Sequence, residues 1–286
     1  MREYLSLTKP GIVFGNAVAA LAGFLLASGV HPVWERGIFM ILFLACVIAS
    51  ACTFNNYFDR DIDARMERTK ERSFVRGSVS VPLALFFACA LIAIGLAGLL
   101  ILTTLLAALI ALVGFLSYLG LYSLWGKRRG PWGTLVGSIS GATPPLVGYA
   151  AALGRLDAAA ALLFIAMCAW QMPHFYAIAV RRLEEYRSAG IPTLPLRYGL
   201  ARTKVSMLFY IALFTIAASL LTPLGYLGRS YFFFMWVVGL SWFLLCLRRA
   251  PDGGEALWAR RVFLASLAIL FLWCMALGVS AVLALP

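Results

Sequence analysis

Charge-free apolar stretches alternate along the chain with short segments that hold nearly all of its charged residues. The stretches cover residues 10–34, 37–58, 77–126, 130–154, 158–180, 205–228, 230–247 and 262–286. A membrane-spanning helix needs roughly 20 apolar residues. The third stretch therefore has room for two helices, with a turn expected near Thr103–Thr104. The pattern predicts nine membrane-spanning helices.

Composition supports this interpretation. Of the 286 residues, 63% are hydrophobic and 13% are charged, whereas soluble domains have roughly 45–50% and 25%. Disordered, fibrous and almost all soluble folds are therefore excluded, and we expect an all-α polytopic membrane protein. The first apolar stretch leads directly into further spans, which argues against a cleavable signal. The six cysteines lie inside apolar stretches and form no C-x-x-C pair. We therefore expect them to be small buried residues of the core.

The basic residues indicate how the chain is oriented. Its net charge is +12, from 24 Lys and Arg and 12 Asp and Glu. If the N-terminus is cytoplasmic, nine spans place 21 of the 24 basic residues on the cytoplasmic side, near the N-terminus and in the loops 59–76, 127–129, 181–204 and 248–261. Arg36, Arg155 and Arg229 remain on the other side. An excess of Lys and Arg on the cytoplasmic side is typical of membrane proteins. It explains the net positive charge, so binding to nucleic acid need not be invoked.

The acidic residues are clustered on the same side. Ten of the twelve are expected there, and seven form two groups. Asp59, Asp61, Asp63, Glu67 and Glu71 follow the second span, and Glu184 and Glu185 follow the sixth. Membrane orientation is nearly indifferent to Asp and Glu, so these clusters need another explanation.

The first cluster contains a polar stripe. On a continuing helix, residues four apart differ by only about 40° in direction, so Asn55, Asp59 and Asp63 share one face, and Asp61 points away. Mg²⁺ favours one or two carboxylates together with substrate phosphates, so the stripe suits a metal–diphosphate complex. The alternative is a solvated helix end, stabilised by pairing with its own arginines.

Basic residues follow at two places. Arg68 and Arg72 could bind phosphate oxygens through their guanidinium groups, or serve only as a topology signal. Lys127 and Arg128 end the fourth span. A functional role for them and a role as the positive end of an interfacial aromatic belt are equally reasonable there. Beyond them, Pro144 and Pro145 break a span rich in small residues, which is tolerated in a membrane where the backbone lines a cavity.

Histidine occurs twice in the chain. His31 lies in a His-Pro turn on the far side and has no expected role. His174 stands in Trp170-Gln171-Met172-Pro173-His174-Phe175, near the second acidic pair. A lone histidine near the end of a span is commonly a hydrogen-bonded core residue, but this setting supports a ligand role equally well.

Three motifs carry a resemblance to a known family: Asn-Asn-Tyr-x-Asp-Arg-Asp-Ile-Asp at 55–63, Tyr-Ser-x-x-x-Lys-Arg at 122–128 and Trp-Gln-Met-Pro-His-Phe at 170–175. With them the chain resembles the UbiA-type intramembrane prenyltransferases, and within that family the branch of haem O synthases. The resemblance covers nearly the whole chain. It implies one intramembrane prenyltransferase domain over 1–286, with nine helices around a central cavity that cytoplasmic loops cap.

The resemblance also implies a set of site residues. Mg²⁺ would be bound by the first acidic motif and by a second one, at Asn55, Asp59, Asp63 and either Glu184 or Glu185. In the second motif other branches have spaced aspartates, whereas this chain has an adjacent Glu pair. The diphosphate would be bound by Arg68, Arg72, Lys127, Arg128 and Arg181. The catalytic groups would be Asp59, Asp63, Lys127 and Arg128, and His174 would bind haem.

The implied reaction transfers the farnesyl group of farnesyl diphosphate to the 2-vinyl group of haem b. Water is added, and haem O and diphosphate form for haem-copper oxidase assembly. The implied setting is the inner (cytoplasmic) membrane, with haem A synthase or oxidase assembly proteins as partners. One alternative is another aromatic or tetrapyrrole acceptor. The other is an ion-coupled transporter, although transporters place such acidic groups near the bilayer midplane and not at one face.

Overall fold

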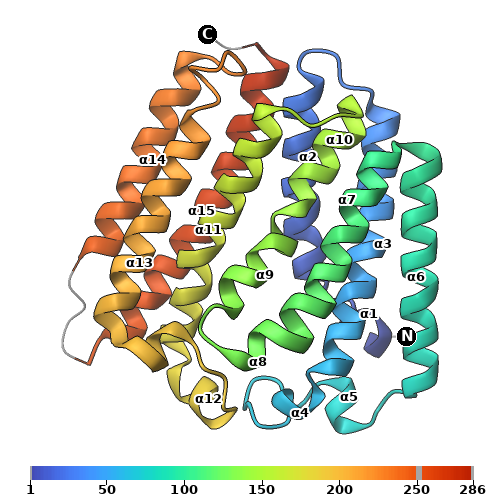
Figure 1. The fold of residues 1–286 in the computed structure, drawn as a ribbon, viewed down its shortest axis with the longest axis vertical. Helices are drawn as coiled ribbons and strands as arrows, with labels where there is room; N and C mark the ends of the chain where they lie inside the picture. The colour runs from blue at the N-terminus through green and yellow to red at the C-terminus, as the bar shows by residue number, and fades with distance from the viewer. Residues whose placement is uncertain (1, 249–252, 285–286) are drawn as a thin grey trace.

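The computed structural model describes residues 2–248 and 253–284, and over these ranges every regular element is a helix. Figure 1 shows the long helices side by side, with α1, α4, α5, α8 and α12 together at one end of the bundle. The helices in chain order are α1 (Arg2–Leu7), α2 (Pro10–Ser28), α3 (Trp34–Phe58), α4 (Arg60–Asp63), α5 (Ser73–Arg76), α6 (Val81–Leu102), α7 (Leu105–Leu116), the π-helix η1 (Ser117–Gly126), α8 (Lys127–Arg129), α9 (Gly133–Gly141), α10 (Thr143–Leu153), α11 (Ala158–Arg181), α12 (Leu183–Ser188), α13 (Leu194–Ser219), α14 (Arg229–Leu247) and α15 (Glu255–Val282).

The predicted all-α membrane fold is confirmed. Within the described ranges, eight helical segments are long and apolar enough to cross a bilayer, counting Leu105–Arg129 as one. The predicted fifth span is divided between α9 and α10 at Ala142, beside the two prolines. The eight segments do not include α9 or α10, and counting this pair as one further span gives the predicted nine. The turn expected near Thr103–Thr104 is present, because α6 ends at Leu102 and α7 begins at Leu105.

Some boundaries differ from the sequence pattern. The predicted loop 181–204 contains α12 and the first residues of α13, which kinks at Gly199, where φ is 76°. Helix α15 begins at Glu255, ahead of its apolar stretch, because charged residues can extend a helix beyond the membrane. Parts of two predicted segments, residues 249–252 and 285–286, lie outside the described residues.

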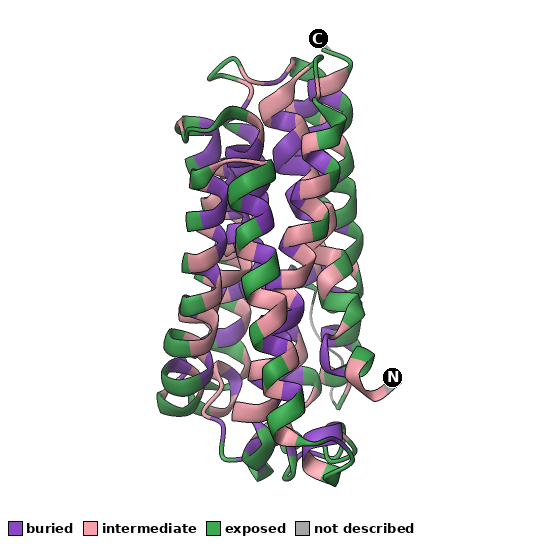
Figure 2. Cartoon of the chain, turned by 90° about the vertical axis from the view of Figure 1, so that its right-hand side faces the viewer, coloured by how far each residue is buried: buried purple, intermediate pink, exposed green. Residues whose placement is uncertain are grey.

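The outer surface of the bundle is apolar. Figure 2 shows buried positions between the helices and exposed positions along their outward sides. Large side chains such as Phe86, Ile101 and Val237 are more than two-thirds exposed. Soluble monomers rarely expose such extensive apolar surface, whereas lipid covers it without penalty. The protein is therefore a multi-pass membrane protein.

Helices α2 and α10 approach each other especially closely. A Cβ atom on Gly148 would overlap the carbonyl oxygen of Ala20, and one on Gly23 would overlap the carbonyl oxygen of Pro145. Both obstacles are backbone atoms, which cannot rotate away as a side chain can. Small residues allow this kind of close helix packing in membranes. The contact fixes the position of Pro144 and Thr143, which line the central cavity.

We expect Gly148→Ala to destabilise the protein by about 1–3 kcal/mol or more, because the added methyl group forces α2 and α10 apart. Thermal unfolding in detergent, followed by circular dichroism, would measure the loss. Gly120→Ala is the matched control, because Gly120 is exposed and no atom lies within 4 Å of its added Cβ. Equal unfolding temperatures of the two variants would contradict the proposed close contact.

Candidate functional site

A cavity of about 910 Å³ lies between the helices and extends to the end of the bundle that carries α4, α8 and α12. Its polar lining comes from residues far apart in sequence: Lys9, Asn55, Asp59, Asp63, Arg68, Arg72, Lys127, Arg181 and Arg182. Its apolar and aromatic lining includes Tyr118, Tyr122, Trp170, Phe175, Phe263, Leu267 and Leu270. The cavity therefore joins a highly charged region to an aromatic one.

The stripe predicted from the four-residue spacing lies on one side of this cavity. Helix α3 ends at Phe58, but helical hydrogen bonds continue from the Asp59 N–H to the Asn55 carbonyl (2.9 Å) and from the Asp63 N–H to the Asp59 carbonyl (2.8 Å). Asn55, Asp59 and Asp63 are buried and line the cavity. Asp61 faces away, with a side chain that is 51% exposed.

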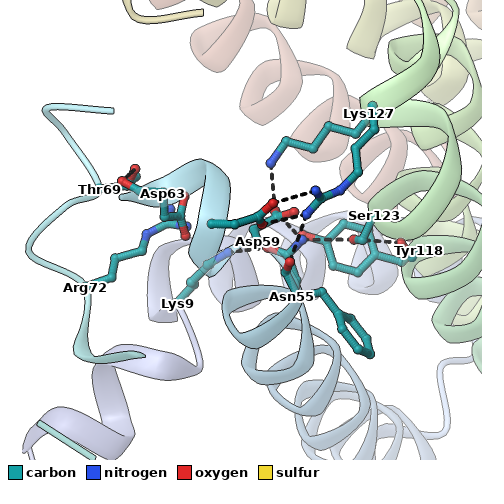
Figure 3. A network of polar contacts seen from close by, with 12 residues as sticks. Lys9, Asn55, Asp59, Asp63, Thr69, Arg72, Tyr118, Ser123 and Lys127 are labelled. Atoms are coloured by element: carbon teal, nitrogen blue, oxygen red, sulfur yellow. Dashed lines mark hydrogen bonds and ion pairs between the residues drawn. The ribbon is translucent and has the colours of Figure 1, made fainter. Parts of the chain in front are cut away.

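Each stripe carboxylate is paired with a cation through one oxygen (Figure 3). Lys127 Nζ lies 2.7 Å from Asp59 Oδ2, and Arg72 Nη1 lies 2.5 Å from Asp63 Oδ2. Asn55 donates to Asp59 Oδ2 (2.8 Å) and accepts from Lys9 Nζ (2.8 Å). The other Asp59 oxygen, Oδ1, is buried without a hydrogen-bond partner. A buried carboxylate oxygen in this state is destabilising, and a bound cation would relieve it.

The donor set fits a hard divalent cation that shares its ligands with a substrate. Across the described ranges, no group of three His, Cys, Asp or Glu side chains is arranged to hold a metal ion. Two carboxylates and an amide oxygen leave several coordination positions of a six-coordinate ion open. Mg²⁺ characteristically fills such positions with phosphate oxygens and water.

Positive charge is concentrated beside the stripe. Burial lowers the pKa of Arg68, and the nearby charges of Arg72 and Arg182 lower it further. Burial also lowers the pKa of Lys9 to about 8, with Arg72 contributing and the carboxylates opposing. These shifts indicate several cations held in a poorly hydrated place. A multivalent anion such as a diphosphate would stabilise all of them.

The π-helix η1 brings the fourth span into this network. Its wider turns place Ser123 Oγ within 3.0 Å of the Tyr118 carbonyl and within 2.9 Å of Asn55 Nδ2. The rings of Tyr118 and Tyr122 stack with centroids 5.7 Å apart. The chain then continues into α8, whose Lys127 reaches Asp59. Segments of π-helix are frequent at functional sites, and apolar periodicity gives no signal for them.

Arg128 occupies a different position from Lys127. It does not belong to the cavity lining and binds Asp61 outside it, with two hydrogen bonds of 2.7 and 2.8 Å. These bonds lower the pKa of Asp61 to about 2. The predicted phosphate-binding residues Arg68, Arg72, Lys127 and Arg181 do line the cavity, whereas Arg128 is kept from it by its pairing.

The second acidic pair lies on α12, away from the cavity lining. The Glu184 side chain is 76% exposed and pairs with Arg187. Glu185 pairs with Arg182 at 2.5 Å, and its other oxygen is buried without a partner. The structure therefore does not bring these carboxylates into the cavity with the stripe, and their role as metal ligands stays a prediction.

His174 lies in the aromatic region of the cavity wall, on α11 one residue after Pro173. Its ring stacks on Trp170 with centroids 4.9 Å apart and lies 5.0 Å from the ring of Phe263. Its Nδ1 is 2.7 Å from the hydroxyl oxygen of Ser266 on α15. The structure thus places His174 in the same cavity as the stripe, at the region suited to an aromatic molecule.

Several lining residues were missed by the sequence analysis. Lys9 is the clearest, because it contacts Asn55 and has φ of 52°, an uncommon backbone conformation for a residue with a side chain. A lysine directly before the first span, followed by Pro10, was its only sequence signal. Arg182, which lines the cavity, and Ser123, which lies outside the lining but accepts a hydrogen bond from Asn55, were also not indicated by the sequence pattern.

Comparison with known proteins agrees with this geometry. Residues 16–267 match the model of the UbiA prenyltransferase family. A protein of a Marinomonas species named Protoheme IX farnesyltransferase is 43% identical over 93% of this chain and 90% of its own length. A Klebsiella pneumoniae protein of the same name is 41% identical with the same coverage.

Solved structures share the fold at lower sequence identity. A digeranylgeranylglyceryl phosphate synthase superposes with a TM-score of 0.80, 19% identity and 98% coverage of both chains. A UbiA homologue from Archaeoglobus fulgidus bound to GPP and Mg²⁺ superposes with a TM-score of 0.71 and 19% identity, and the match covers 96% of this chain and 99% of that chain. By the family match and the identity to its relatives, the chain belongs to the UbiA prenyltransferase family.

Proposed function

We propose that the protein transfers the farnesyl group of farnesyl diphosphate to the 2-vinyl group of haem b, with addition of water, and releases haem O and diphosphate. The observation that carries this proposal is the 41–43% identity, over 93% of the chain, to relatives named Protoheme IX farnesyltransferase. The geometry supports it, because one cavity joins a cationic region to an aromatic region that contains a histidine.

The diphosphate would bind at the charged end. Arg68, Arg72 and Lys127 would contact its oxygens, with Arg181, Arg182 and Lys9 adding positive charge. Arg72 and Lys127 now pair with Asp63 and Asp59, so binding would redirect them to the phosphate. Cations positioned on the leaving group lower the barrier to breaking the C–O bond.

Mg²⁺ would be held by Asp59 and Asp63, with Asn55 as the third protein ligand. When bound, it would neutralise charge that develops on the leaving diphosphate. Asn55 Oδ1 already accepts a hydrogen bond from Lys9, so ligation through this oxygen requires Lys9 to turn towards the phosphate. Asn55 Nδ2 would continue to orient Asp59 from the other side.

The acceptor would occupy the aromatic part of the cavity, among Trp170, Phe175 and Phe263. There the C1 atom of the farnesyl group leaves diphosphate and forms a C–C bond with the terminal vinyl carbon. Water then adds to the resulting cation on the porphyrin side chain and loses a proton. Apolar walls protect the allylic cation from earlier capture by water. His174 would orient the porphyrin by binding the haem iron.

The distribution of charge supports a setting for this reaction. The excess of basic residues at the end with α4, α8 and α12 supports a cytoplasmic N-terminus in the inner membrane, with the diphosphate entering from the cytoplasm. Family membership favours an enzyme over an ion-coupled transporter. The remaining enzyme alternative, a different aromatic or tetrapyrrole acceptor, would be recognised by testing purified protein against a panel of acceptors.

A direct assay tests the proposal. Purified protein in lipid vesicles, given haem b, farnesyl diphosphate and Mg²⁺, is expected to form haem O, resolved by chromatography. Removing divalent metal with EDTA should lower the rate by at least about 100-fold, and added Mg²⁺ should restore it. Absence of haem O in the complete mixture would refute the proposed reaction, and full activity in EDTA would refute the metal requirement alone.

The second acidic pair gives a separate prediction. Glu185→Gln is expected to lower the rate by roughly 10-fold, because it weakens a charged hydrogen bond to Arg182 at the cavity wall. Glu184→Gln is the matched control and should lose at most about fivefold, since an exposed ion pair contributes little. A larger loss for Glu184→Gln than for Glu185→Gln, measured as haem O formed per minute, would reverse this assignment.

A further inference from the structure

Ser266 connects α15 to the histidine in the cavity wall. The residue is completely buried. Its hydroxyl oxygen lies 2.6 Å from the Phe263 carbonyl oxygen and 2.7 Å from His174 Nδ1. Its own carbonyl oxygen accepts a hydrogen bond of 2.9 Å from the indole N–H of Trp170, the ring on which His174 stacks. Ser266 therefore fixes both the imidazole and its stacking partner.

The positions of the protons in this network follow from the donors available. A serine hydroxyl has a single proton, and a backbone carbonyl can only accept. At 2.6 Å, the proton of Ser266 must lie between its oxygen and the Phe263 carbonyl, because two oxygens that close without a proton repel each other. The hydroxyl oxygen then accepts from His174, so the proton of the imidazole is on Nδ1.

The other ring nitrogen consequently has a free lone pair. A neutral imidazole has one N–H, and here it is used by Ser266. Over residues 2–248 and 253–284, Nε2 of His174 forms no hydrogen bond and no salt bridge. Since the Nδ1 side is bound to α15 and His174 lines the cavity, the Nε2 side is the one left available there.

We propose that Ser266 is a positioning residue that holds His174 in the Nδ1-protonated tautomer and thereby offers the Nε2 lone pair to the iron of the porphyrin acceptor. The iron part of this inference rests on the proposed function, whereas the tautomer part does not. Neutral imidazole is a usual ligand of haem iron. Histidines that ligate metals generally donate their other N–H to a carboxylate, a backbone carbonyl or water, and loss of that partner weakens metal binding by roughly 10- to 100-fold. The Ser266 hydroxyl oxygen would serve in the same way.

The tautomer can be measured directly. In a His31→Gln background, His174 is the single histidine of the sequence, and ¹⁵N chemical shifts of labelled protein in detergent distinguish its two nitrogens. We expect a protonated Nδ1 and an unprotonated Nε2, a shift towards the Nε2-protonated form in Ser266→Ala, and recovery in Ser266→Thr. An Nε2-protonated ring in the parent protein, or an unchanged ring in Ser266→Ala, would overturn the proposal.

Haem titration tests the second part. Ser266→Ala should weaken haem b binding by about 10-fold and reduce the absorption signature of histidine-ligated iron, and His174→Ala should abolish that signature. Ser241→Ala is the control, because Ser241 makes the same hydroxyl bond to the carbonyl three residues earlier without touching a histidine. Haem spectra that His174→Ala leaves unchanged would overturn iron ligation, even if the parent protein forms haem O. A parent protein that forms no haem O would refute the proposed function, and the ¹⁵N spectra would still decide the tautomer.

Discussion

Replacing Asp59 by asparagine is expected to lower haem O formation by roughly 100- to 1,000-fold, the loss typical when one preorganised charge-stabilising group is removed from an active site. Asp59 is 2% exposed, lines the cavity and has a buried oxygen, Oδ1, without a hydrogen-bond partner. Asparagine keeps the size of the side chain but removes the negative charge that would hold Mg²⁺. The apparent Mg²⁺ requirement should therefore rise together with the loss of rate.

Asp61→Asn is the matched control for this experiment. Asp61 lies two residues further on, in the short helix α4 that follows Asp59, but its side chain is half exposed and pairs with Arg128 outside the cavity lining. Its replacement should change the rate by at most about fivefold, as expected for an exposed ion pair. Gel filtration of both variants would verify that they fold. Similar losses in the two variants would show that the stripe does not bind the metal.

The sequence was sufficient for the features that depend on local periodicity. Apolar runs long enough for a bilayer predicted the helices and the turn after Leu102, and two prolines predicted the division between α9 and α10. The four-residue spacing of Asn55, Asp59 and Asp63 predicted their shared face, because the helical hydrogen bonds continue through the end of α3. These features need no knowledge of how the helices pack.

Features that depend on packing between distant segments could not be predicted in this way. Lys127 and Arg128 are adjacent, and the motif that contains them predicts the same role for both. In the structure Lys127 binds Asp59, which lines the cavity, whereas Arg128 binds Asp61, which does not. Lys9 enters the site because α1 and α2 bring it to Asn55, 46 positions away. The partner of each cation is set by tertiary structure, and local spacing contains no information about it.

The two halves of the proposed reaction make opposite demands, and the cavity accommodates both. Breaking the C–O bond requires concentrated positive charge, supplied where Lys9, Arg72 and Lys127 meet the carboxylates. The allylic cation that results is stabilised by aromatic faces and must be kept from water and from those same cations. Placing the acceptor beside Trp170, between α11 and α15, would keep it apart from these three cations within one continuous cavity.

Lys127→Met and Arg128→Met separate these roles at adjacent positions. Lys127→Met should lower kcat/KM for farnesyl diphosphate by roughly 100-fold, because it removes a cation that, in the proposed reaction, would contact the leaving group. Arg128→Met should lower it by at most about fivefold, since its two hydrogen bonds to the exposed Asp61 act outside the cavity. Steady-state kinetics at saturating haem b would measure both. If Arg128→Met is as damaging as Lys127→Met, then Arg128 leaves Asp61 during the reaction and acts on the diphosphate, as the sequence motif alone had suggested.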